Sequence, residues 1–147
     1  MNTSEHPDID ETLARYERQI RDVGLLCEPI DYGSMRGLRI PFEFEKYELR
    51  TYVDDTQFIQ FRTGYILTEE QKKDRELINT LAVDVTGASK GTTVVIDEDG
   101  DVFVVVEYFI PPNQEIAPTL LRTLRAIQYT VRRFFETLRE KLGSPDE

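Results

Sequence analysis

Residues 91–110 have the sequence GTTVVIDEDGDVFVVVEYFI, and this stretch decides the fold class. Two runs rich in β-branched and aromatic residues, at 91–96 and 102–110, flank the turn Asp-Glu-Asp-Gly at 97–100. An Asp-Gly turn between two such runs predicts an antiparallel β-hairpin. Pro111 and Pro112 follow at once, and they predict the end of the second strand because proline has no amide hydrogen to donate to a sheet.

A helix and three strands are predicted before this hairpin. Apolar residues recur every three or four positions over residues 9–23, which predicts an amphipathic helix that ends at Gly24. The period then changes to two, the spacing at which the side chains of a β-strand alternate between its faces. This alternation predicts a three-stranded meander over residues 38–44, 47–53 and 58–61.

Two further helices are predicted, one on each side of the hairpin. Thr68 and Gln71 form a capping box, and the apolar stripe that follows predicts a helix up to Gly87. The last helix is predicted over residues 118–142, because its first residue is a proline, which suits a first helical turn, and because Gly143 then stops it.

The predicted order of elements is α-β-β-β-α-β-β-α. This order is typical of an α+β fold with a five-stranded antiparallel sheet and helices packed mainly on one face. A length of 147 residues is common for one domain and suffices to bury a core. We therefore predict a single α+β domain over residues 9–142, between a flexible N-terminus at residues 1–8 and a flexible C-terminus at residues 143–147.

Composition and charge exclude several classes of partner. The chain carries 28 acidic and 18 basic residues, a formal net charge of −10, which opposes binding to nucleic acids and to anionic membranes. Its longest apolar stretch, residues 101–112, is too short to span a bilayer, and the first ten residues lack the features of a secretory signal. We expect a cytoplasmic protein with no nucleic-acid or membrane partner.

No group of residues in the sequence is typical of catalysis. The single cysteine, Cys27, lies among apolar residues, and the single histidine, His6, lies in the polar N-terminal stretch. A cysteine nucleophile would need a basic environment and a nearby histidine. Acidic pairs such as Asp54 with Asp55 are too common in this chain to be specific. We predict that the protein is not an enzyme and uses neither a cofactor nor a metal.

The acidic turn of the hairpin is the group that most resembles a set of metal ligands. Calcium prefers several oxygen ligands from a short loop, and this turn offers Asp97, Glu98, Asp99 and Asp101. An EF-hand loop, however, has its glycine at the sixth position, whereas Gly100 is the fourth residue counted from Asp97. We therefore favour a solvated hairpin turn over a calcium site.

Aromatic residues of the strands are the candidates for contact with another protein. Residues 102–110 carry apolar side chains on both faces of one strand, so one face still needs a cover after helices pack on the other. A homodimer would provide that cover, and we predict one. The candidate protein-binding residues are Phe58, Phe61, Phe103 and Tyr108.

The last helix has a basic outer side. Residues 118–142 hold six basic and two acidic residues, a net charge of +4, so the rest of the chain has a net charge of −14. We favour arginines that pair with acids of the neighbouring sheet or subunit over a dedicated anion site. If an anion site exists, its candidate residues are Arg122, Arg125, Arg132 and Arg133, with Tyr129 among them.

Several of these features together resemble the YbjN-like family, within the superfamily of type III secretion chaperone-like folds. They are the order of elements, the helix with Leu77-Ile78-Asn79, the strand-turn-strand over residues 94–100 and the long final helix. The resemblance covers most of residues 9–142, and it implies a three-helix, five-stranded fold that is usually homodimeric. Secretion chaperones of the superfamily hold partially unfolded segments of client proteins. This sequence differs in its loop at residues 113–117 and in its arginine-rich last helix.

The function that we expect is a non-enzymatic protein-interaction module, chaperone-like or regulatory, that binds a protein segment as a homodimer. Sheet edges or apolar grooves would provide the contacts. The alternative is a small-molecule or anion sensor that uses the arginine side of the last helix.

Overall fold

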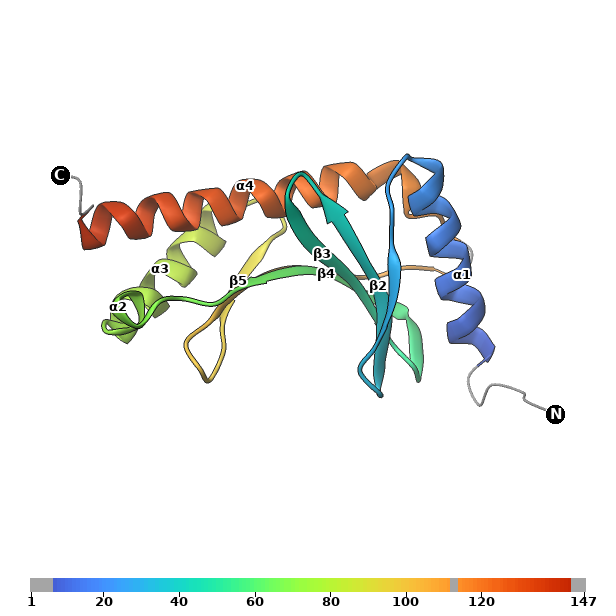
Figure 1. The fold of residues 1–147 in the computed structure, drawn as a ribbon, viewed down its shortest axis with the longest axis horizontal. Coiled ribbons are helices and arrows are strands. Elements are labelled where there is room, and N and C mark those ends of the chain that lie inside the picture. Colours follow the sequence, from blue (N-terminus) through green and yellow to red (C-terminus); the bar gives the residue numbers. More distant parts are fainter. Residues whose placement is uncertain (1–6, 112–113, 144–147) are drawn as a thin grey trace. The chain divides into compact units, whose positions relative to one another are not determined.

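Figure 1 shows the fold of the chain as a computed structural model, which describes residues 7–111 and 114–143. Its elements are, in order, α1 (Pro7–Asp22), β1 (Glu28–Asp31), β2 (Met35–Phe42), β3 (Glu45–Tyr52), β4 (Asp55–Tyr65), α2 (Glu69–Lys72), α3 (Arg75–Ala88), β5 (Thr93–Ile96), β6 (Val102–Phe109) and α4 (Ala117–Leu142). The predicted flexible ends, residues 1–8 and 143–147, lie outside the described residues except for Pro7, Asp8 and Gly143. His6, Pro112 and Asn113 also lie outside them.

Six strands form one sheet, in the order β1-β2-β3-β4-β6-β5. Strands β1 and β2, β2 and β3, and β5 and β6 pair antiparallel. The α+β class is confirmed, and so is the hairpin, in which Thr93 pairs opposite Val105 and Ile96 opposite Val102. The predicted number of five strands is wrong, and the predicted order of elements is wrong at two places, β1 and the helix after β4.

The strand missing from the prediction is β1, at one edge of the sheet. It has only four residues, and one of them is Pro29, which pairs opposite Leu38 of β2. An edge strand needs amide hydrogens on one side only, so a proline is tolerated where its nitrogen faces away from the sheet. Because the strand is short and contains proline, it lacks the alternating pattern from which strands are predicted.

The second predicted helix is in fact two helices. Thr68 forms the predicted capping box, since its Oγ1 accepts the amide hydrogen of Gln71 at 3.1 Å and its own amide donates to the Gln71 side chain at 2.8 Å. That helix, α2, has four residues. Asp74 then begins α3, because its side chain accepts a hydrogen bond from the amide of Leu77 at 3.0 Å. An aspartate that caps a new helix therefore explains the break.

The chain divides into two compact units. Unit 1 comprises residues 1–61 and 107–124, and unit 2 comprises residues 62–106 and 125–147. Strands β4 and β6 and helix α4 each have residues in both units. The single domain over residues 9–142 stays a prediction.

In unit 1 the core lies between α1 and one face of the sheet. Alternate strand residues are buried there, namely Leu38, Ile40, Tyr47, Leu49, Ile59 and Phe61. Helix α1 contributes buried residues at helical spacing, namely Ile9, Leu13, Tyr16 and Ile20. Full burial of one such side chain contributes about 1.5–3 kcal/mol, so this core is a main source of stability. The intervening strand residues point to the opposite face of the sheet.

In unit 2, helix α3 and the second part of α4 supply the core with buried residues. From α3 they are Ile78, Leu81, Ala82 and Val85, and from α4 they are Ile127, Phe134 and Leu138. Two hydroxyl groups share this interior, since the Oγ1 atoms of Thr92 and Thr130 form a buried hydrogen bond of 2.6 Å. That bond joins the residue before β5 to α4, and it gives each buried hydroxyl group a hydrogen-bond partner.

Helix α4 begins at a cap provided by α1. Gln19 is 9% exposed, and its Oε1 accepts hydrogen bonds from the amides of Ile116 at 2.6 Å and Ala117 at 3.0 Å. These are amides near a helix start, which have no partner within the helix itself. Across residues 7–111 and 114–143, no helix has both the length and the apolar character needed to cross a membrane.

Candidate protein-interaction surface

Three aromatic rings form an exposed cluster in unit 1, and we call Tyr52, Phe58 and Phe109 the aromatic face. The ring of Phe58 lies 5.1 Å from that of Tyr52 and 5.8 Å from that of Phe109, measured between centroids. Tyr52 is 39% exposed and Phe109 is 74% exposed, while Phe58 between them is half-buried. Contiguous exposed apolar surface is typical of a site where another molecule binds.

Strand alternation and one backbone hydrogen bond position these rings. Ile59 is fully buried, so its neighbour Phe58 points to the opposite face of β4. The amide of Ile110 donates to the carbonyl oxygen of Gln57 at 2.7 Å, which holds the end of β6 beside the start of β4. Phe109 therefore lies next to Phe58 because its neighbour in sequence is anchored.

Polar side chains of β1, β2 and β3 in unit 1 are paired with one another. The Glu48 carboxylate accepts hydrogen bonds from the Tyr32 hydroxyl at 2.7 Å and from Arg50 at 2.6 Å. The Arg50 guanidinium also lies over the Tyr32 ring, 4.3 Å from its centroid, and Arg39 pairs with Glu28 at 3.2 Å. Burial raises the pKa of Glu48, but the hydrogen bonds from Tyr32 and Arg50 outweigh it, and the net effect lowers the pKa.

A second polar pair lies on the two strands that carry Phe58 and Phe109. Gln60 of β4 donates from Nε2 to Glu107 of β6 at 3.0 Å. Burying an unpaired charge in an interface costs several kcal/mol, whereas a charge that is already hydrogen-bonded costs less. The Glu107 carboxylate therefore has a partner within the chain, whereas Oε1 of Gln60 is buried and has none among the described residues. The exposed groups that gain from being covered are the aromatic rings.

The four candidate protein-binding residues occupy different environments. Phe58 belongs to the aromatic face. Phe61 is fully buried, and its ring stacks on Tyr108 at a centroid distance of 6.4 Å. Tyr108 is half-buried, and burial raises its pKa. Because Phe61 and Tyr108 serve the core of unit 1, they are not part of the surface. Of these candidates, only Phe58 belongs to the aromatic face. Its two partners there, Tyr52 and Phe109, were not predicted as binding residues.

Phe103, the fourth candidate, is covered by another side chain of unit 2. The Arg62 guanidinium lies over its ring, 4.2 Å from the centroid. Gly64 of β4 lies beside the same ring, and a Cβ atom at this glycine would come within 2.5 Å of Phe103 Cε1. A ring packed against a glycine and an arginine has most of its contact surface occupied. The apolar outer face of β6, from which we predicted a homodimer, is therefore exposed mainly at Phe109, its last residue.

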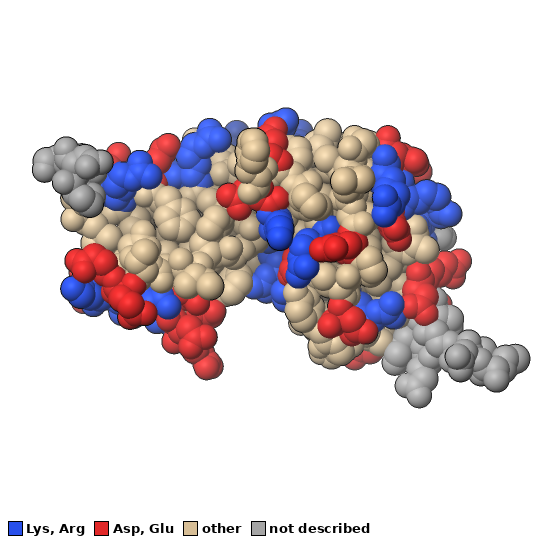
Figure 2. All heavy atoms as spheres, viewed as in Figure 1, with Lys and Arg blue, Asp and Glu red and all other residues tan. Residues whose placement is uncertain are grey.

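All four candidate anion-binding arginines are exposed on α4. Arg122 belongs to unit 1, and Arg125, Arg132 and Arg133 belong to unit 2. In unit 2 the basic side chains along α4 contrast with the acidic side chains of the β5–β6 turn (Figure 2). Tyr129 is 60% exposed and lies one helical turn before Arg132 and Arg133. These arginines form a charged stripe along a helix.

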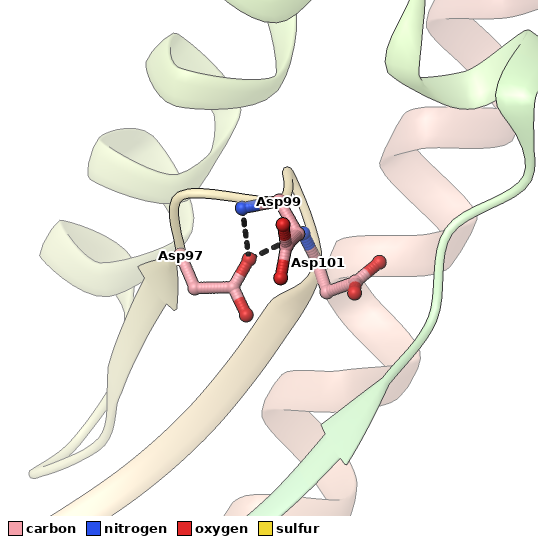
Figure 3. Close-up of side chains that lie close together, drawn as sticks. All are labelled: Asp97, Asp99 and Asp101. Carbon is pink, nitrogen blue, oxygen red and sulfur yellow. Dashed lines mark hydrogen bonds between the residues drawn. The ribbon is translucent and has the colours of Figure 1, made fainter.

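The acidic turn between β5 and β6 is a compact hydrogen-bonded structure (Figure 3). Asp97, Asp99 and Asp101 each place a carboxylate oxygen within 4.8 Å of the others. Oδ1 of Asp97 accepts the amide hydrogens of Asp99 at 3.0 Å and of Asp101 at 2.9 Å. Oδ1 of Asp101 pairs with Lys72 at 3.0 Å and accepts the Leu67 amide at 3.1 Å. The carboxylates that a cation would need already hold the turn and α2 together.

Unit 1 also contains a cavity that was not predicted. Its volume is about 290 Å³, near the lower limit for a small-molecule site. It is lined by Asp8, Glu11, Thr12, Arg15, Tyr16, Thr56, Gln57, Ile110 and Pro111. Burial raises the pKa of Tyr16, whose ring is 1% exposed. Thr12 in this lining is buried, which the sequence pattern alone does not show.

Cys27 does not have the environment of a nucleophile. Its side chain is 8% exposed, and burial raises the pKa of its thiol. A raised pKa keeps the sulfur protonated at neutral pH, and the protonated thiol is the unreactive form. The prediction that the protein is not an enzyme stays a prediction.

The comparisons with known proteins bear on the fold. No protein-family model matches the chain, and no curated protein matches it. The chain is similar in structure to an uncharacterized protein from Methanothermobacter thermautotrophicus, with a TM-score of 0.68 and 12% sequence identity. The likeness covers 90% of this chain and 99% of the archaeal chain. At this identity the likeness shows a shared fold.

Proposed function

We propose that this chain is a non-enzymatic protein-interaction module, chaperone-like or regulatory, that acts as a homodimer and binds an apolar segment of another protein on the aromatic face. The observation that carries the proposal is the exposed ring of Phe109, 74% exposed, packed edge-on against Phe58. Exposed aromatic clusters are the usual anchors of protein contacts, because large rings bury much apolar area at a small cost in side-chain entropy.

Features of the two edge strands favour a face over an edge as the binding site. On β5 the amide of Val94 already donates to the Thr86 side chain at 2.8 Å, so it is not available to an added strand. On β1 the proline at position 29 has no amide hydrogen, and the strand ends in acids at Glu28 and Asp31. Short edges with proline and charges resist strand addition. The proposal therefore differs from our expectation of sheet-edge contacts.

The chemistry of the face indicates what kind of segment it binds. The carboxylates of Glu48 and Glu107 have hydrogen-bond partners within the chain, so a ligand gains little by offering them a positive charge. Apolar side chains, by contrast, gain roughly 25 cal/mol for each Å² removed from water. With a net charge of −10, this chain also repels acidic segments. The expected client is an apolar segment without a net negative charge.

The homodimer is supported by the resemblance to the YbjN-like family and to secretion chaperones, which implies a dimer that holds client segments. The exposed last residue of β6, Phe109, belongs to the aromatic face and is covered by the client in this proposal. A sensor of anions on α4 has weaker support, since its four arginines are exposed and Arg122 lies in another unit than the other three.

Affinity capture from the native cytoplasm at physiological salt tests the proposal. Wild-type protein, Phe109→Ala and Tyr52→Ala are compared, with Ile66→Ala as matched control because Ile66 is 86% exposed but lies in unit 2. We expect one stoichiometric protein to co-purify with the wild type and the control, and its amount to fall about tenfold or more with each aromatic variant. Isolation of the wild type alone, or equal capture by all four proteins, would reject the proposal.

A further inference from the structure

The turn between β2 and β3 has an unfavourable backbone conformation. Phe42 pairs opposite Glu45, so the loop contains only Glu43 and Phe44. Their φ angles are +47° and +70°, and among the described residues they are the only ones besides glycines with positive φ. Two-residue loops of this kind favour Asn and Gly, because a left-handed conformation costs other residues roughly 1–2 kcal/mol each.

The side chain of Phe44 adds nothing that offsets this cost. It is fully exposed, with a relative exposure of 109%. Its neighbours on the core side of the hairpin behave differently, since the rings of Phe42 and Tyr47 are buried and lie 6.1 Å apart. A glycine at position 44 would make the free protein more stable. Strained residues that do not serve the fold are typical of sites that bind something else.

The chain itself carries a surface that complements the β2–β3 turn in charge. Phe44 lies between two acids, Glu43 and Glu45. Helix α4 provides the complementary charge, because residues 118–142 have a net charge of +4 in a chain of −10. On that helix Tyr129 is 60% exposed, and Arg132 and Arg133 are exposed one turn further along.

The two surfaces also match in the chemistry of their rings. An arginine stacked on an aromatic ring contributes about 0.5–2 kcal/mol. The chain uses this contact within its units, where Arg50 lies 4.3 Å from the Tyr32 ring centroid and Arg62 lies 4.2 Å from that of Phe103. Tyr129 offers an edge or face for a second ring, and the arginines offer partners for a carboxylate.

We propose that the β2–β3 turn of one copy docks on α4 of a second copy. The Phe44 ring packs against Tyr129 beside Arg132 and Arg133, and Glu45 pairs with Arg132. The proposal rests on the homodimer of the proposed function and names its interface, which is separate from the aromatic face.

Light scattering and sedimentation over micromolar concentrations test the interface on purified protein. Phe44→Gly is expected to raise the melting temperature and to raise the dimer dissociation constant about tenfold or more, as for the loss of one aromatic anchor. Because the variant is more stable, its dissociation cannot be attributed to misfolding. Ile66→Ala, the control, is expected to leave the dimer unchanged.

A charge exchange provides the second, independent measurement. Glu45→Arg and Arg132→Glu are each expected to weaken the dimer, and the double variant to restore it, because the pair then re-forms with reversed charges. If Phe44→Gly and both single charge variants have the same dimer dissociation constant as the wild type, this interface is overturned but the homodimer stays in place. A wild type that is monomeric at all concentrations overturns the homodimer itself, whereas client capture through Phe109 is measured separately.

Discussion

The Lys72 ammonium group lies 3.0 Å from Oδ1 of Asp101 and so links the last residue of α2 to the residue before β6. The hydrogen bond from Lys72 lowers the pKa of Asp101, and the same bond raises the pKa of Lys72. The side chains are 22% and 17% exposed. The pair and the neighbouring amide of Leu67 tie α2 to the acidic turn.

This pair predicts how stability depends on pH. The folded pKa of Asp101 is lowered, so its contribution is present above the unfolded value of about 3.9 and is lost as the pH falls through the folded pKa. The folded pKa of Lys72 is raised, so its contribution is lost only at high pH, above about 10.4. We expect wild-type protein to lose more stability than Asp101→Asn between about pH 5 and pH 2, measured by urea unfolding. Parallel pH profiles of the two proteins would argue against the pair.

Calcium is expected to leave the stability of the wild type unchanged. Asp97 accepts the amide hydrogens of Asp99 and Asp101, and Asp101 accepts that of Leu67 and pairs with Lys72, so an ion would have to displace these partners. The measurement is the melting temperature with and without about 1 mM calcium, a concentration at which extracellular calcium modules bind. Lys72→Met removes the competing cation and is the matched variant. A shift in the wild type would revive the calcium site that we set aside.

Substitution of Tyr47 by phenylalanine is expected to stabilise the protein. The Tyr47 side chain is fully buried, and within the described part of the chain its hydroxyl has no hydrogen-bond partner. An unsatisfied buried polar group costs about 1–3 kcal/mol, so Tyr47→Phe should gain about 1 kcal/mol at neutral pH by urea unfolding. A loss of stability in Tyr47→Phe would mean that the hydroxyl is hydrogen-bonded.

The same variant predicts a difference at alkaline pH. Burial raises the pKa of Tyr47 to about 12, and the nearby charges of Glu45 and Glu43 add to this effect. The neutral phenol is therefore favoured in the folded state, and its contribution is lost as the pH rises from about 10, the unfolded value, toward the folded pKa. Wild-type protein should lose stability over this range, and Tyr47→Phe should lose less. Identical alkaline profiles would contradict the raised pKa.

Two glycines are expected to respond to alanine in opposite directions. Gly37 of β2 lies against the backbone of β3, and a Cβ atom there would collide with the carbonyl oxygen of Leu49. Gly37→Ala should cost about 1–3 kcal/mol or more, since backbone must move to admit the methyl group. Gly87 of α3 has open space around it, so Gly87→Ala should gain about 0.5–1 kcal/mol. Both values come from urea unfolding, and equal effects of the two substitutions would contradict the difference in packing.

The sequence by itself determined those elements whose pattern is local and repeated. The hairpin at 91–110 was predictable because two β-prone runs flank an Asp-Gly turn, and α1 and α4 because their apolar residues recur with the helical period. The charge distribution could also be predicted from the sequence, since the basic side of the last helix depends only on the residues at 118–142. Each of these signals arises from residues that are neighbours along the chain.

Tertiary structure decided which side chains remain on the surface, because burial depends on partners that are distant in sequence. Phe58 and Phe61 lie three residues apart in the same strand, yet Phe61 is buried against Tyr108 and Phe58 belongs to the aromatic face. Periodicity distinguishes the two faces of a strand but does not say which face a helix covers. The strand β1 and the strained turn at Phe44 likewise depend on pairing across the sheet, which brings together residues that no local pattern connects.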